Sequence, residues 1–271
     1  MSEPAMPFWR IEIRNVSKTF SHAGQQLLVL DTVSLQVRDR EFVSVIGPSG
    51  CGKSTLLNII AGLEEPSSGE VWLDGSPAPE RLGRVAYMHQ RDLLLPWRTV
   101  LDNVVLGLEL AGVPRAQARE RARGWLARFG LEGFADVYPA ALSGGMRQRA
   151  AFLRTLLTER PVLLLDEPFG ALDALTRAEM QEWLLALWGD VGRTVLFVTH
   201  DVEEAILLAD RVLVMSQRPG RILREYSVPL PRPRTYQHVT DPAFVALKAE
   251  LLATLRAERV KGQDNVPAVR S

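Results

Sequence analysis

The stretch EFVSVIGPSGCGKSTLLNIIAGL, residues 41–63, is the most informative part of this 271-residue chain. It opens with a short, β-branched apolar run that stops at Gly47, which is typical of a buried strand. From Thr55 to about Gly62 the apolar residues recur at helical spacing. Between them, GPSGCGKS fits G-x-x-x-x-G-K-[ST], the pattern of a phosphate-binding loop between a strand and a helix. The stretch therefore predicts an α/β protein that binds a nucleotide.

The residue types of this loop suit a bound triphosphate. Glycines allow backbone N–H groups to turn inward around the phosphates. Lys53 supplies a point charge for the β- and γ-phosphates, and the Ser54 hydroxyl reaches Mg²⁺. Cys51 is interpreted as a small residue that the loop tolerates, with a reactive thiol as the alternative. The residues expected to contact ATP are Gly47, Pro48, Ser49, Gly50, Cys51, Gly52, Lys53, Ser54 and Thr55.

A second apolar run, VLLLDE at 162–167, ends in two carboxylates. We expect a buried strand that delivers Asp166 to its C-terminal end, where the carboxylate holds the metal, usually through water. Glu167 points differently from its neighbour and can polarise a water molecule. The alternative for Glu167 is to cap the turn at Pro168.

Two further strand ends carry polar side chains. His200 follows the apolar run VLFVT, and Gln90 ends YMHQ. In open α/β sheets the ligand lies beyond the carboxyl ends of the strands, so we expect both side chains at the same site. His200 is predicted to contact the γ-phosphate and Gln90 to interact with a metal-bound water. A separate stretch, LSGGMRQR at 142–149, places a serine and two glycines at the start of a predicted helix, which is a second anion-binding pattern.

Strand patterns alternate with helical patterns along the chain, which predicts a mostly parallel sheet covered on both faces. The strand candidates besides 41–46 are 10–37, 71–75, 84–90, 161–168, 193–200 and 211–217. Residues 92–160 are predominantly helical in pattern and are interpreted as an insertion into the sheet. Two later helices are expected, one at 203–210 and one near the C-terminus.

Composition limits the function classes. Lys and Arg total 32, as do Asp and Glu, so the formal net charge is zero and the basic surplus typical of nucleic-acid binders is missing. The single cysteine cannot form an internal disulfide, which fits a reducing compartment. The N-terminal residues show no signal-peptide pattern, and no apolar stretch is long enough to span a bilayer. We expect an intracellular protein unless a partner recruits it to a membrane.

Taken together, LSGGMRQ (142–148), VLLLDE (162–167), GALDAL (170–175) and VTH (198–200) resemble the ATP-binding cassette (ABC) ATPases, over residues 10 to about 217. The resemblance implies a P-loop NTPase of the ABC fold, with a mostly parallel core sheet, an antiparallel β subdomain and an inserted α-helical subdomain. The boundaries that follow are 8–240 for the ATPase domain, about 92–160 for the helical subdomain, 241–260 for a C-terminal helix and 261–271 for a disordered tail.

In that family two chains face head to tail, and each ATP lies between the phosphate-binding loop of one and the signature of the other. The resemblance therefore implies a homodimer, although different cassettes could also pair. Asp173 would lie across the dimer interface, but a helix N-cap is an equal alternative. Phe20 would stack on adenine, where the family more often has Tyr. The resemblance implies that Glu167, His200 and Gln90 are catalytic and that Ser54, Gln90 and Asp166 bind the metal. The signature residues that would act on the partner's ATP are Ser143, Gly144, Gly145 and Gln148.

Residues 91–112, with SQRPGRI (216–222) and PLPRPR (229–234), look like the nitrate, sulfonate and taurine group of bacterial importers. This implies a membrane permease as partner, an extracytoplasmic solute-binding protein, and a peripheral position on the cytoplasmic face of the inner membrane. Pro96 and Trp97 would contact the permease, with core packing as the alternative for Trp97. The solute stays open. The competing function is a soluble ABC ATPase that serves a macromolecular assembly, such as iron–sulfur cluster building.

Overall fold

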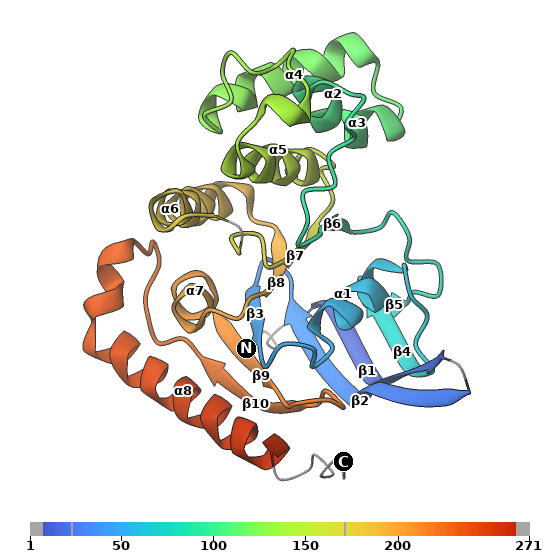
Figure 1. Ribbon diagram of the computed structural model, residues 1–271, viewed down its shortest axis with the longest axis vertical. Coiled ribbons are helices and arrows are strands. Elements are labelled where there is room, and N and C mark those ends of the chain that lie inside the picture. The colour runs from blue at the N-terminus through green and yellow to red at the C-terminus, as the bar shows by residue number, and fades with distance from the viewer. Residues whose placement is uncertain (1–7, 23, 171, 264–271) are drawn as a thin grey trace, which may run out of the picture.

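The computed structural model describes residues 8–22, 24–170 and 172–263, and its centre is a six-stranded sheet (Figure 1). The strand order is β10-β9-β3-β8-β7-β6, in which β9, β3, β8, β7 and β6 run parallel and β10 is antiparallel to β9. The strands are β3 (Phe42–Ile46), β6 (Ala86–Met88), β7 (Val162–Asp166), β8 (Thr194–Val198), β9 (Arg211–Met215) and β10 (Ile222–Ser227). The predicted mostly parallel sheet is confirmed.

The sheet is covered on both faces, as the uninterrupted apolar strands require. Every residue of β3, β7 and β8 is buried. Alternate side chains of β3 enter different cores, with Phe42 and Ile46 in one and Val43 and Val45 in the other. The helices that pack around the sheet are α1 (Lys53–Ala61), α6 (Ala174–Val191), α7 (Val202–Leu208) and α8 (Pro242–Gln263), with a 3₁₀ turn, η2 (Tyr236–Thr240), before α8.

A second sheet of four antiparallel strands, in the order β2-β1-β4-β5, lies beside α1 (Figure 1). Its strands are β1 (Trp9–His22), β2 (Gln25–Arg38), β4 (Ser68–Leu73) and β5 (Ser76–Pro77). Inward residues of β1 and β2, such as Ile13 and Val33, join the core beneath α1. This is the antiparallel β part that the family resemblance implies.

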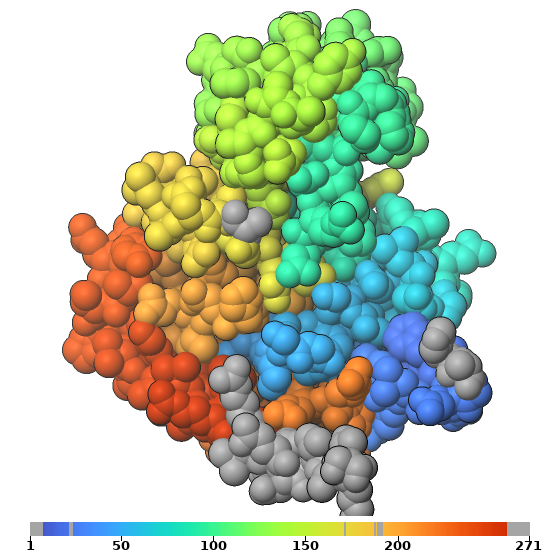
Figure 2. Space-filling model, viewed as in Figure 1, coloured from blue at the N-terminus to red at the C-terminus, as the bar shows by residue number. Residues whose placement is uncertain are grey.

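The inserted helices form a separate lobe above the sheet, which we call the helical lobe and which Figure 2 shows in green. It consists of α2 (Val100–Val104), α3 (Leu106–Leu110), α4 (Arg115–Arg128), the 3₁₀ turn η1 (Pro139–Ala141) and α5 (Gly144–Leu156). The apolar core of the helical lobe is continuous with one core of the sheet. For example, Phe152 of α5 contacts Trp183 of α6, with ring centroids 5.3 Å apart.

Three features differ from the sequence-based prediction. The edge strand β10 was not predicted, and the 18-residue helix α6 was implied only by the alternative that Asp173 is a helix N-cap. The apolar residues of α6 do not keep to one face, and β10 pairs on one side only and carries the exposed Arg224 and Glu225 in its centre. Helix α8 continues to Gln263, so the expected tail begins three residues too early, and 264–271 lie outside the described residues. Among the described helices, none combines the length and apolarity needed to cross a membrane.

Candidate nucleotide-binding site

The loop between β3 and α1 has a backbone that only glycine adopts without strain. Gly52, the N-cap of α1, has φ of 109°. A Cβ atom on Gly52 would lie 2.6 Å from Cδ2 of Leu30, which is closer than packed carbon atoms allow. None of the described side chains caps α1, so its first N–H groups stay available to an anion. The loop thus has the form of a phosphate-binding site.

A cavity of about 530 Å³ opens over this loop. Its walls come from β2, the loop, the ends of β6, β7 and β8, and the β9–β10 connection. The residues that line it are Val29, Ser49, Gly50, Gly52, Lys53, Ser54, Thr55, Gln90, Glu167, His200 and Arg218. The structure therefore brings together side chains that are up to 189 positions apart in the chain, from Val29 to Arg218.

Lys53 supplies the cation predicted for this site. Its side chain bends back so that Nζ donates to the carbonyl oxygens of Gly47, at 2.9 Å, and Pro48, at 3.1 Å. Both hydrogen-bond partners are neutral carbonyls, and the ammonium charge also interacts with the buried Asp166 without a direct ion pair. The ammonium is therefore positioned for a charge-assisted hydrogen bond to a phosphate.

Asp166 lies at the end of β7 and is 4% exposed. Burial raises the pKa of this carboxyl, a hydrogen bond with Ser54 opposes the rise, and the charge of Glu167 adds to it. Tyr87 donates to Asp166 Oδ2 at 3.4 Å. No group of three or more His, Cys, Asp or Glu that could hold a metal occurs among the described residues. A hydroxyl and one carboxylate fit Mg²⁺, which prefers oxygen ligands and keeps waters and phosphate oxygens in its shell.

Glu167 has a backbone conformation that is rare for a non-glycine residue, with φ of 45°. Its N–H donates to the carbonyl of Val198 at 2.8 Å, which ties this strained residue to β8. Its Oε2 accepts from Gln90 Nε2 at 3.0 Å and lies 3.2 Å from His200 Nδ1. The three residues predicted from separate strand ends therefore meet at one carboxylate.

Other predicted site residues lie outside the cavity. Phe20 is half-buried on β1 and Lys18 Nζ lies 4.8 Å from its ring centroid, so one face of the ring is already occupied. Asp173 accepts from the Thr176 N–H at 3.0 Å and is the N-cap of α6, the alternative that the sequence left open. Its pKa is lowered chiefly by the hydrogen bond from the Thr176 backbone.

The signature residues start α5, away from the phosphate-binding loop of the same chain. Ser143 is the N-cap and its Oγ accepts from Met146 N at 3.2 Å, while Ser143 and Gly144 are exposed. Gln148 differs from the expectation that it acts on a partner's ATP. It is 4% exposed, and its Nε2 donates to the Pro168 carbonyl at 2.8 Å. Buried in its own chain, Gln148 joins α5 to the turn after Glu167.

Sequence reasoning missed two residues that line the cavity, Val29 and Arg218. Val29 is one of many apolar residues in a strand pattern and carries no chemical signal. Arg218 belongs to SQRPGRI, a stretch that was interpreted only as a mark of one importer group. Neither has a sequence neighbour in the phosphate-binding loop, so only folding places them there.

A model of the ABC transporter family matches residues 30–170. The chain belongs to this family. An uncharacterized ABC transporter ATP-binding protein of Methanocaldococcus jannaschii is 45% identical over 93% of both chains. The taurine import ATP-binding protein of Rhizobium johnstonii is 44% identical over 86% of this chain and 91% of its own.

A solved structure of a dimeric ATP-binding cassette, in a post-hydrolysis state bound to ADP and Pi, has the same fold as this ABC ATPase. The TM-score is 0.73 and the identity 34%, covering 82% of this chain and all of that one. The predicted ABC fold, the ATPase activity and the likeness to the taurine group are confirmed by these similarities. The roles of individual site residues stay predictions.

Proposed function

We propose that this ABC ATPase is the ATP-hydrolysing subunit of a bacterial importer that takes up a small solute of the nitrate, sulfonate and taurine class. The observation that carries the proposal is a complete Gln90–Glu167–His200 cluster in a chain 43–45% identical to taurine import ATP-binding proteins. The chain would lie on the cytoplasmic face of the membrane, bound to a permease. A solute-binding protein would deliver the solute to that permease. We assign the cassette to residues 8–240, with its helical subdomain at about 92–160.

The cavity suggests how the chain's own residues divide the work. Lys53 and the N–H groups of α1 bind the phosphates. Glu167 polarises the attacking water through the carboxylate that Gln90 and His200 position. The His200 side chain is 61% exposed, so its second ring nitrogen is free to reach the γ-phosphate. Ser54 and Gln90, with Asp166 through water, would hold Mg²⁺, and the chemistry supplied there would be positive charge beside the phosphates.

A second copy of the chain completes the site in this proposal. The N-terminus of α5, with Ser143, Gly144 and Gly145, carries unpaired N–H groups and no bulky side chain, which suits a phosphate. Because this surface lies away from the chain's own phosphate-binding loop, it would serve the ATP of a partner. Asp173 and Phe20 are proposed to lie at the dimer interface and against adenine, respectively.

The permease contact is assigned to residues 91–99, between Gln90 and α2, which we call the docking segment. Trp97 is 71% exposed, so core packing, the alternative for this residue, is wrong. Leu93 is 48% exposed, with φ of 47°. On one side Arg154 of α5 donates to the carbonyls of Asp92 and Leu93, both at 2.7 Å. Exposed apolar side chains on a loop held by hydrogen bonds suit a docking surface for a short helix of a membrane partner.

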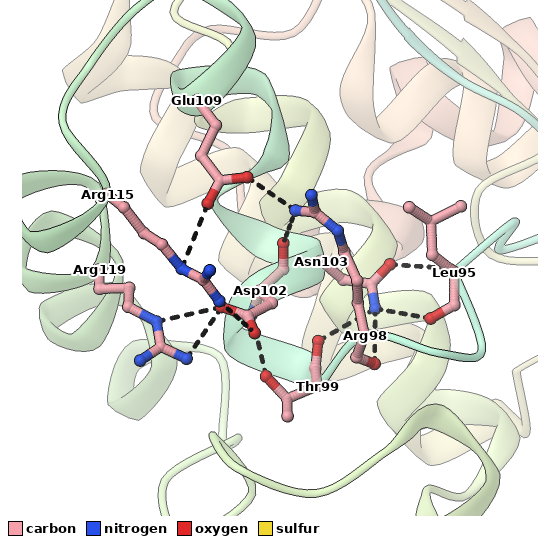
Figure 3. A network of polar contacts seen from close by, with 8 residues as sticks. All are labelled: Leu95, Arg98, Thr99, Asp102, Asn103, Glu109, Arg115 and Arg119. Carbon is pink, nitrogen blue, oxygen red and sulfur yellow. Dashed lines mark hydrogen bonds and ion pairs between the residues drawn. The ribbon is translucent and has the colours of Figure 1, made fainter.

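The other side of this segment is held by α2 (Figure 3). Asn103 is fully buried, and its amide bonds to the backbone of Leu95, Arg98 and Thr99. Asp102 accepts from Arg115 and Arg119, which come from α4. The polar network therefore ties the docking segment to the frame of the helical lobe, so that movement of the lobe would move the permease.

The test is purification in detergent with the membrane protein that binds this chain, followed by ATPase measurement in lipid. Trp97→Ala should weaken the complex about 30-fold, since a buried interface tryptophan typically contributes about 2 kcal/mol. Leu82→Ala, which alters an apolar residue that is 72% exposed outside the helical lobe, is the control. If Trp97→Ala binds the membrane protein as tightly as the wild type does and its ATPase activity is stimulated as strongly, the docking assignment is wrong. If no membrane protein binds the wild-type chain, the importer function is wrong.

A further inference from the structure

The stretch SQRPGRI, residues 216–222, joins β9 to β10 and contacts the nucleotide site. The N–H of Gly220 donates to the Val29 carbonyl at 2.8 Å, and the Gly220 carbonyl accepts from Asp31 N at 3.0 Å. This backbone pairing fixes the loop to β2. A Cβ atom on Gly220 would lie 2.2 Å from the Cys51 carbonyl oxygen, so the loop lies directly against the phosphate-binding loop.

The loop is also rigid within itself. Ser216 Oγ accepts from Arg221 N at 2.9 Å, and its single hydrogen is shared between the carbonyls of Gln217, at 2.8 Å, and Pro219, at 3.0 Å. One hydroxyl thus connects both ends of the turn. A side chain that leaves this turn is therefore presented from a fixed backbone, which reduces the entropy lost when it binds a ligand.

The two arginines of the loop have different surroundings. Arg221 is engaged, since its Nε donates to Asp31 Oδ2 at 2.9 Å. Arg218 forms no hydrogen bond or ion pair with any residue that the structure describes, although it lines the cavity together with Ser49, Gly52 and Lys53. An unpaired guanidinium beside a phosphate-binding loop has the charge and the donor geometry for a phosphate group.

We propose that Arg218 is a nucleotide-binding residue whose guanidinium contacts the phosphates of ATP and ADP, in addition to Lys53. The carboxylate of Glu167 lines the cavity, and the buried carboxylate of Asp166 lies behind it against Ser54. Both negative charges oppose the entry of a polyanion. A second cation offsets that repulsion. Glu167 is contacted by Gln90 and His200, and Arg218 has no hydrogen bond or ion pair with it among the described residues. Arg218 would therefore raise the affinity for both nucleotides without taking part in bond cleavage.

Arg218→Ala is the test variant, and equilibrium binding of MgADP and MgATP to the purified chain is the readout. Loss of one charged hydrogen-bond donor in a partly exposed site should weaken both nucleotides about tenfold. The affinity of Arg218→Lys should lie between those of the wild type and Arg218→Ala, because lysine keeps the charge but lacks the forked donors of the guanidinium. Raising the salt concentration should weaken wild-type binding more than that of Arg218→Ala.

Arg256→Ala is the matched control, since it removes an exposed arginine on α8 that does not line the cavity. It should bind both nucleotides like the wild type, and thermal unfolding without nucleotide should show that each variant is folded. Lys53→Ala should abolish binding. If Lys53→Ala abolishes nucleotide binding while the affinity of Arg218→Ala stays within about twofold of the wild type, the loss is well under that expected of a charged contact. The Arg218 inference is then wrong, and the assignment of the nucleotide site to the phosphate-binding loop is unaffected. An equal loss in Arg256→Ala would also overturn it.

The inference rests on the nucleotide site and not on the proposed solute or permease. Binding to the isolated chain is measured without any membrane partner. Failure of the importer assignment would therefore appear in the association and stimulation assays alone, and failure of the Arg218 assignment in nucleotide affinity alone.

Discussion

Asn103→Ala is expected to destabilise the docking segment while leaving the nucleotide cavity intact. Asn103 Oδ1 accepts from Leu95 N at 2.7 Å. Its Nδ2 donates to the carbonyls of Leu95, Arg98 and Thr99 at 3.0, 3.1 and 3.0 Å (Figure 3). Alanine removes every one of these bonds and supplies no replacement, so the segment before α2 loses its connection to the helix.

The magnitude follows from these contacts. The amide nitrogen carries two hydrogens for three carbonyls, so the side chain is worth three hydrogen bonds rather than four. At about 1 kcal/mol net for each, the free energy of unfolding should fall by about 3 kcal/mol. For a domain of this size that corresponds to a fall in the unfolding midpoint of about 6–9 °C.

Three measurements test this prediction. Thermal unfolding gives the midpoint, and hydrogen exchange should show faster exchange at residues 93–99 than in the wild type. MgATP binding to the isolated chain should be unchanged, because Asn103 does not line the cavity. Permease-stimulated ATPase activity should fall, since the docking segment no longer has one conformation. The control is Gln117→Ala, which removes an exposed amide from α4 of the same lobe.

Gln117→Ala should change stability by less than about 0.5 kcal/mol, as is usual for an exposed side chain. If Asn103→Ala lowers the midpoint no more than this control does, the hydrogen bonds do not hold the segment and the reasoning is refuted. A loss of MgATP affinity as large as the loss of stimulation would also refute it, because the effect would then not be confined to the docking segment.

Two further predictions concern charge. Glu167→Gln should keep the fold and ATP binding but lower the rate of ATP hydrolysis by about 10²–10⁴-fold, since an amide cannot act as a base. Phosphate release measures this rate, and size-exclusion chromatography should show ATP-dependent dimerisation of the variant. An undiminished rate would exclude the proposed role of Glu167. Burial alone would raise the pKa of Asp102, but hydrogen bonds from Arg115 and Arg119 outweigh it and lower the pKa. The carboxylate therefore stabilises the fold above its unfolded pKa of about 3.9, and this contribution is lost as the pH falls through the lower folded value. Asp102→Asn should cost about 1–2 kcal/mol at pH 7 in urea unfolding, and the difference from the wild type should shrink below about pH 4; a constant difference down to pH 3 would contradict this sign.

Local patterns were enough for the centre of the site. The strand before Gly47 and the helix after it are adjacent in sequence, so the loop between them could be identified from spacing alone. Gln90, Glu167 and His200 could be predicted to meet because parallel strands bring their C-terminal ends to one edge. The strands β3, β7 and β8 were predictable for a related reason, since burial on both faces requires uninterrupted apolar runs.

Other features depend on pairings between distant segments. Residue 218 reaches the cavity because the Gly220 backbone pairs with Val29 and Asp31 of β2, about 190 positions earlier, and no local pattern encodes that contact. Gln148 has the spacing of a surface signature, but the packing of α5 on the turn at Pro168 buries it. Side-chain periodicity reports which face of one element is apolar, whereas hydrogen bonds between elements depend on how those faces are brought together. The chemistry of the phosphate-binding loop was therefore readable along the chain, while the position of Arg218 at the cavity and the hydrogen bonds that hold residues 93–99 arise only on folding.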